Sequence, residues 1–147
     1  MQSYIFDFKK SPSFMRKWNK EFDVEDIGTN CFNIVLVDDV CDDNIEDVLN
    51  LDGQIKYNES HLIIAECGLN YVIDDDSHEH IILNGEVEID FADLDIDDFN
   101  MKGCFITNDG GYVMGYSINT FSLNISNGII FENGLYLWSI IEGEVNG

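Results

Sequence analysis

Positive charge is scarce in this chain. Its 147 residues contain 7 Lys and Arg against 29 Asp and Glu, a formal net charge of −22 at pH 7. Five of the basic residues lie within the first 20 positions, so residues 21–147 carry 28 acids and 2 lysines. Negative charge at this density repels nucleic acid and anionic membranes and attracts basic partners. We therefore expect neither nucleic acid nor a membrane as a direct partner.

Cysteine motifs, linkers and long apolar runs are also missing. The four cysteines lie 10, 26 and 37 positions apart, and each adjoins an apolar run, which predicts buried free thiols in a reducing cytosol. One proline and no Gly/Ser-rich stretch favour a single domain over residues 1–147. No run approaches the roughly 20 apolar residues of a membrane span, and the first residues lack the apolar core of a secretion signal. These features predict a cytoplasmic protein.

Apolar and aromatic residues, by contrast, are plentiful. A hydrophobic content of 45%, with 10 Phe, 6 Tyr and 2 Trp, is enough to fill one core. Short runs of Ile, Val, Phe and Tyr alternate with Gly-containing turns, which is typical of antiparallel strands. The chain is therefore predicted to be mainly β, an antiparallel β-sandwich or compact barrel. The expected strands are 31–37, 54–57, 61–66, 69–73, 79–83, 86–91, 103–107, 112–118, 121–125, 129–132 and 135–141, with turns at Gly53, Gly68, Asn84-Gly85, Asp109-Gly110-Gly111, Asn127-Gly128 and Asn133-Gly134.

One or two short helices are expected in the N-terminal third. Ser11-Pro12 is a typical helix start, and apolar residues then recur at helical spacing, which predicts a helix over 12–22. A second helix is expected from about Asp43 to Leu51, with an aspartate at its N-terminal cap. Residues 1–25 thus form a basic N-terminal segment that contains the first helix.

The middle of the chain predicts an acidic face. Carboxylates alternate with apolar residues over 86–97, and the apolar phase changes at Ala92. We interpret this change as a bulge or as a bend at which the chain passes from one sheet to another. The carboxylates expected to form a ladder in solvent are Glu86, Glu88, Asp90, Asp93, Asp95 and Asp97.

Two short patterns resemble metal sites. His78-x-His80, with Asp74, Asp75, Asp76 and Glu79 nearby, would place two imidazoles on one face of a strand, but a polar turn before a strand explains the same residues. Asp93-x-Asp95-x-Asp97 imitates the opening of a calcium-binding loop, in which Gly is needed where Asp98 stands and Glu where Cys104 stands. We therefore predict no metal site at either pattern.

Catalytic motifs are not recognisable in the sequence. Nucleophilic catalysis needs Ser or Cys beside His, and of the three histidines only His61 lies in an apolar strand context. The glycines of Gly110-Gly111-Tyr-Val-Met-Gly115 have neither the spacing nor the following helix of a phosphate-binding loop. We predict that the protein is not an enzyme and has no catalytic residues and no cofactor.

Four stretches in the second half share a pattern of glycine-turn hairpins. They are Asn84-Gly-Glu-Val-Glu-Ile-Asp-Phe91, Met101-Lys-Gly-Cys-Phe-Ile-Thr-Asn-Asp-Gly-Gly-Tyr-Val-Met-Gly-Tyr116, Phe121-Ser-Leu-Asn-Ile-Ser-Asn-Gly-Ile-Ile-Phe131 and Gly134-Leu-Tyr-Leu-Trp138. This pattern resembles a β-module of small tailed-bacteriophage virion proteins, such as head-decoration, head-fibre and tail-associated proteins. It departs from the module at Ile129, where an Asp or Thr is usual. The resemblance covers about residues 84–141.

The resemblance implies a structural role. The C-terminal β-module, residues 84–141, would pack onto copies of itself or onto neighbouring virion proteins, after synthesis in the bacterial cytoplasm. Aromatic anchors dominate interface energetics, so contact residues are expected among the aromatics of this module, with ordinary core packing as the alternative for each. These residues are Tyr112, Tyr116, Phe121, Phe131, Tyr136 and Trp138.

A second hypothesis comes from the charge alone. Rows of carboxylates at strand spacing can imitate the phosphates of DNA, and electrostatic steering would speed capture of a basic target. The protein would then be an acidic inhibitor, an anti-defence or immunity protein that covers the basic groove of a nuclease or another nucleic-acid-handling protein. Salt separates the two hypotheses, because charge-driven binding weakens as ionic strength rises while an apolar interface persists.

Overall fold

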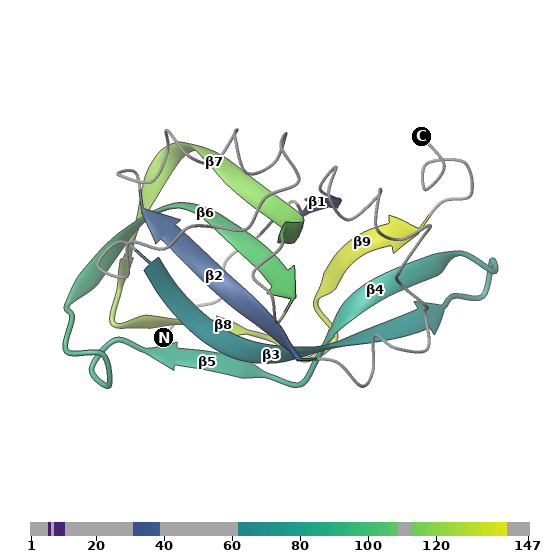
Figure 1. The fold of residues 1–147 in the computed structure, drawn as a ribbon, viewed down its shortest axis with the longest axis horizontal. Coiled ribbons are helices and arrows are strands. Elements are labelled where there is room, and N and C mark those ends of the chain that lie inside the picture. The colour runs from purple at the N-terminus through teal and green to yellow at the C-terminus, as the bar shows by residue number, and fades with distance from the viewer. Residues whose placement is uncertain (1–5, 7, 11–30, 39–61, 109–112, 141–147) are drawn as a thin grey trace.

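The chain folds into β-strands, as the alternating apolar pattern predicts. A computed structural model describes residues 6, 8–10, 31–38, 62–108 and 113–140 (Figure 1). Its strands are β1 (Lys9–Lys10), β2 (Phe32–Asp38), β3 (Leu62–Ile73), β4 (Glu79–Asn84), β5 (Val87–Asp90), β6 (Asp98–Asn108), β7 (Val113–Ser126), β8 (Gly128–Phe131) and β9 (Tyr136–Ile140). The helices predicted at 12–22 and 43–51, the strand at 54–57 and the turns at Gly53 and 109–111 lie outside the described residues.

One antiparallel sheet contains most of these strands. Its order is β1-β7-β6-β2-β3-β4-β9, and the two ends of this order, β1 and β9, approach each other. The sheet therefore curls until it nearly closes into a barrel (Figure 1). β5 and β8 form a separate two-stranded sheet, and β5 lies against β3. The predicted mainly β, antiparallel class is confirmed.

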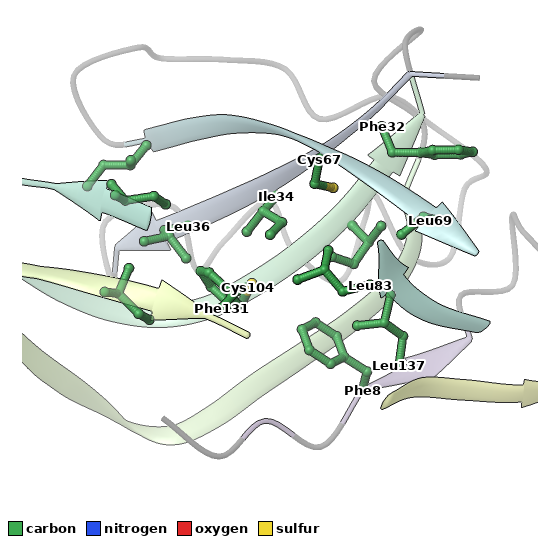
Figure 2. Packing of buried hydrophobic residues seen from close by; sticks show 14 of the residues in the cluster. Phe8, Phe32, Ile34, Leu36, Cys67, Leu69, Leu83, Cys104, Phe131 and Leu137 are labelled. Carbon is green, nitrogen blue, oxygen red and sulfur yellow. The ribbon is translucent and has the colours of Figure 1, made fainter. Parts of the chain in front are cut away.

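The hydrophobic core fills the concave side of the large sheet. β2 is its central strand, paired with β3 and β6, and Phe32, Ile34 and Leu36 alternate along it toward the core. Figure 2 shows these side chains facing Leu69 and Phe131 from other strands. Core residues come from every part of the described chain, so the strands of 84–141 share one core with β2 and β3, and β6 pairs with β2 directly.

Two pairs of predicted strands are single long strands. Gly68 was expected to turn the chain, but β3 runs through it without a break. A Cβ at this position would lie 3.2 Å from the carbonyl oxygen of Asn84, so the glycine permits the close approach of β4 and forms no turn. The strands predicted at 112–118 and 121–125 likewise fall on one strand, β7, which contains a bulge between the two predicted segments.

The turns at 84–85, 127–128 and 133–134 are confirmed. Gly85, Asn127 and Gly134 have φ values of 96°, 69° and 86°, in the left-handed region that Gly and Asn tolerate best. Two of these turns are joined, because the backbone amide of Gly85 donates to Oδ1 of Asn133 at 2.8 Å. Within the described residues, no helix has the length and apolar character needed to cross a membrane.

The segment 86–97 bends between the two sheets. β5 belongs to the two-stranded sheet, a turn follows at residues 91–95, and β6 then begins the large sheet at Asp98. The predicted sheet-switching bend near Ala92 is therefore confirmed. The continuous ladder of carboxylates is not, because Asp93 and Asp95 lie in the turn, with Asp95 at a φ of 61°. The alternation of Asp with apolar residues there reflects the turn and not a strand face.

Candidate functional site

A wide bulge interrupts β7 opposite Lys102. Gly103 pairs with Ile118 and Met101 pairs with Leu123, so Lys102 alone faces residues 119–122. We call residues 119–122 the β7 bulge. Such a bulge lets the longer strand project its extra residues away from the sheet.

Two hydrogen bonds fix the shape of the β7 bulge. Nζ of Lys102 donates to the carbonyl oxygen of Thr120 at 3.2 Å, and Nδ2 of Asn119 donates to the carbonyl oxygen of Met101 at 3.2 Å. They anchor the bulge to β6 from both sides. The local sequence does not reveal these residues, because Asn119 and Thr120 have the composition of an ordinary turn and the partner of Lys102 is distant in sequence.

The β7 bulge presents a large apolar side chain to solvent. Phe121 is 83% exposed, and Ile118 and Leu123 on either side of the bulge are exposed as well. An exposed aromatic of this size, flanked by other exposed apolar side chains on a hydrogen-bonded backbone, is suited to act as a contact anchor. Among the predicted contact residues that the structure describes, Phe121 is thus the most accessible.

The other predicted contact residues fall into different environments. Tyr136 on β9 is 52% exposed, and its ring lies 5.5 Å from that of His80 in an edge-on arrangement. Tyr116 on β7 is half-buried. Tyr112 lies outside the described residues. Tyr136 and Tyr116 therefore retain accessible surface, which Tyr136 offers at the edge strand of the large sheet.

Phe131 and Trp138 are not contact residues. Each is only 2% exposed and belongs to the core. The alternation of β8 turns Phe131 inward, where its ring stacks on that of Phe6 at 5.1 Å. Trp138 pairs with Ile81 of β4 and is buried on the same sheet. The core alternative weighed for both residues is correct, since neither retains a surface for a partner.

The predicted acidic residues are mostly exposed and are divided between β5 and the turn that follows it. Glu86 and Glu88 lie in and before β5, and Asp93, Asp95 and Asp97 lie in the turn and just after it, all exposed. The sixth, Asp90, is half-buried and accepts a hydrogen bond from the backbone amide of Ala92 at 3.0 Å. The segment therefore carries a dense negative charge at the bend between the two sheets.

Asp74 organises the turn between β3 and β4. Its Oδ1 accepts hydrogen bonds from the backbone amides of Asp76 and His78, both at 2.9 Å. Its Oδ2 lies 2.7 Å from Nε2 of His80. The bond with His80, followed by that from the amide of His78, lowers the pKa of Asp74 below its ordinary value of 3.8.

The His-x-His pattern that resembles a metal site has hydrogen-bonding partners within this turn. Asp74, Asp76 and His78 offer ligand atoms within 4.8 Å of one another, and all three are exposed. However, both oxygens of Asp74 already accept hydrogen bonds within the turn. His78 precedes β4, so the two histidines do not share a strand face as the His-x-His pattern suggested. A polar turn explains the arrangement.

Two of the cysteines are buried thiols, as predicted. Burial, and secondarily the charge of Glu66, raises the pKa of Cys67 to about 12, and burial raises that of Cys104 well above 9.0. A thiol that stays protonated is a poor nucleophile and metal ligand. Cys31 is exposed, contrary to the expectation, because it lies just before β2 begins. Cys41 lies outside the described residues.

Comparison of the chain with family models, curated proteins and solved structures gives no match. Relatives therefore assign no residue a role. The β7 bulge with Phe121, the charged bend at 86–97 and the Asp74 turn are the features from which a function has to be derived.

Proposed function

We propose that this protein is a non-catalytic virion assembly protein that packs through β7 onto copies of itself or onto neighbouring virion proteins. The observation that carries the proposal is the 83% exposed side chain of Phe121 on a bulge held by hydrogen bonds. A fixed backbone lowers the entropy that is lost when the anchor binds. Synthesis in the bacterial cytoplasm and incorporation into the virion belong to the same proposal.

The distribution of charge supports an interface at β7 in particular. A chain with a net charge of −22 repels its own copies, so an interface between copies needs a surface low in charge. The fourteen residues of β7 include no Asp, Glu, Lys or Arg. β7 thus combines an exposed aromatic anchor with a locally neutral strand.

Light scattering at low and high salt tests this proposal. We expect a defined oligomer whose molar mass persists at high salt, because apolar contacts strengthen and charge repulsion is screened. The variant Phe121→Ser should lower the molar mass toward that of a single chain. Ile73→Ser is the matched control, because Ile73 is also an exposed apolar strand residue, at 60%, but lies at the end of β3. A single chain at both salt concentrations would contradict self-assembly.

The charged bend favours the acidic inhibitor as the second candidate function. Glu86, Glu88 and the aspartates of 93–97 place exposed carboxylates close together at one bend of the chain. A basic groove of a nuclease would be attracted to this charge. Binding to a panel of basic nucleases should weaken steeply with added salt. The variant Asp93→Asn/Asp95→Asn/Asp97→Asn should bind more weakly at low salt, and with a shallower salt dependence, than the control Asp75→Asn/Asp76→Asn. Binding that is insensitive to salt would contradict this alternative.

A further inference from the structure

The short strand β1 completes one edge of the large sheet. Lys9 pairs with Tyr116 and Lys10 with Gly115, and among the described strands β1 pairs with β7 alone. Two residue pairs give few backbone hydrogen bonds. β1 is therefore held at this edge mainly by the burial of apolar side chains from the residues next to it.

The residues before β1 insert aromatic rings into the barrel. Phe8 is 7% exposed and belongs to the core cluster, where Figure 2 shows it with Leu83 and Leu137. The ring of Phe6 stacks on that of Phe8 at 5.4 Å and on that of Phe131 at 5.1 Å. Removal of Phe6, Phe8 and β1 would uncover the core and the β7 edge at once. We call these residues the N-terminal plug.

A long stretch of sequence separates the N-terminal plug from the rest of its own barrel. The next described strand along the chain is β2, which is separated from β1 in the sheet by β7 and β6. Residues 11–30 lie between them in sequence, and a stretch of that length spans at most about 70 Å. The plug also belongs to the basic part of the chain, which the acidic remainder of any copy attracts.

We propose that the N-terminal plug is exchanged between copies, so that Phe6, Phe8 and β1 of one chain fill the barrel and pair with β7 of a second chain. The contacts in such a pair are the same as within one chain, so exchange adds no new interface chemistry. Intramolecular insertion is favoured by an effective concentration on the order of millimolar, so exchange is expected where copies are concentrated, as in an assembly. The inference deepens the proposed function, on which it rests, by naming a second copy as the partner.

Disulfide trapping of separate chains tests the exchange. One full-length chain carries Lys9→Cys and the other Tyr116→Cys, each with Cys31→Ser and Cys41→Ser and with a different tag. Paired strand residues have Cα atoms about 4.5–5.5 Å apart, within the range that a disulfide bridges. After co-refolding and oxidation, we expect a linked heterodimer severalfold above the mismatched pair Lys9→Cys with Asn124→Cys, at a yield that rises with protein concentration.

The exchange would be overturned if, at the highest protein concentration, the yield of the matched heterodimer did not exceed that of the mismatched pair. A single chain that carries both Lys9→Cys and Tyr116→Cys then identifies the reason. If it forms an internal disulfide, the N-terminal plug stays in its own barrel. If it forms no disulfide, β1 does not pair with β7. An oligomer by light scattering without the matched disulfide would refute the exchange alone. A matched disulfide with a molar mass unaffected by Phe121→Ser would refute the role of the β7 bulge and leave the exchange standing.

Discussion

Oδ2 of Asp74 lies 2.7 Å from Nε2 of His80, across the turn that joins β3 to β4. The other oxygen of the same carboxylate binds two backbone amides of the turn. One aspartate thus connects the end of β3 to the first residues of β4. Because each of these bonds favours the ionised carboxylate, the turn should respond to acid.

Asp74 is expected to titrate below its ordinary pKa of 3.8. A folded-state pKa that is depressed contributes stability that is present above the unfolded pKa and is lost as pH falls through the folded pKa. The turn should therefore loosen below about pH 4, as carbon-detected NMR titration of the carboxylate would show. Asp74→Asn should remove this acid-dependent step, whereas Asp75→Asn, next to it and exposed, should retain it. An Asp74 titration at or above 3.8 would contradict the hydrogen-bonded turn.

The Tyr71 hydroxyl should lose its proton at an unusually high pH. Its hydroxyl donates a hydrogen bond to Glu79, and that bond, with burial and the carboxylate charge, raises the pKa of Tyr71 to about 12 from 10.0. A raised pKa gives a contribution to stability that is present below pH 10 and lost as pH rises through the folded value. Glu79→Gln should bring the pKa of Tyr71 back toward 10.0 in an ultraviolet titration. The control Glu86→Gln, outside this hairpin, should leave it unchanged.

Sequence alone predicts the strands of this fold better than their connections. Short apolar runs mark β2, β4 and β8, because one or both faces of each strand are buried. Asn-Gly pairs mark turns that need a positive φ. Gly68 was misassigned because a glycine needed for close approach of a neighbouring strand has the same local sequence as a glycine in a turn. Only the pairing with Asn84, sixteen positions later, distinguishes the two.

The candidate site was predictable only in part, because it too depends on pairing between strands that are distant in sequence. Which aromatic side chain faces out depends on where its strand lies in the barrel. Phe121 is exposed because the β7 bulge breaks the alternation of its strand. Phe131 is buried because its ring packs in the core cluster and stacks on that of Phe6. Neither register is encoded within the few residues around the aromatic. The hydrogen bond from Lys102 to Thr120 likewise depends on a pairing between distant strands.

Truncation to alanine should change the free energy of unfolding much more at Phe131 than at Phe121. Phe131→Ala leaves a cavity beside Phe6 and should lower the free energy of unfolding by about 3–5 kcal/mol. Phe121→Ala removes an exposed ring and should change it by less than about 0.5 kcal/mol. Denaturant unfolding of dilute protein, with assembly minimised, gives both values. Equal losses would contradict the assignment of Phe121 to the surface.

The turn at Gly134 should be sensitive to a side chain. Its φ of 86° is strained for any residue with a Cβ, and its amide donates to the carbonyl oxygen of Leu83 at 2.9 Å. Gly134→Ala should therefore cost about 1–2 kcal/mol in the free energy of unfolding, although no atom crowds the site. Asn127→Gly, at a φ of 69°, is the converse control and should cost less than Gly134→Ala. A neutral Gly134→Ala would mean that the turn relaxes to a negative φ.

Thr107 offers a stabilising substitution. Its side chain is fully buried on β6, and its Oγ1 has no hydrogen-bond partner within the described residues. A buried hydroxyl without a partner loses its hydration and gains nothing in return, so Thr107→Val, which replaces it with a methyl group, should raise the free energy of unfolding by about 1 kcal/mol. Thr107→Ser keeps the hydroxyl and removes the methyl group, so it should lower the same quantity by about 1 kcal/mol. Chemical denaturation of the three proteins side by side would show the two shifts in opposite directions. If Thr107→Val is instead less stable than the unchanged protein, the Thr107 hydroxyl has a hydrogen-bond partner. The loss of that hydrogen bond then outweighs the gain from apolar burial.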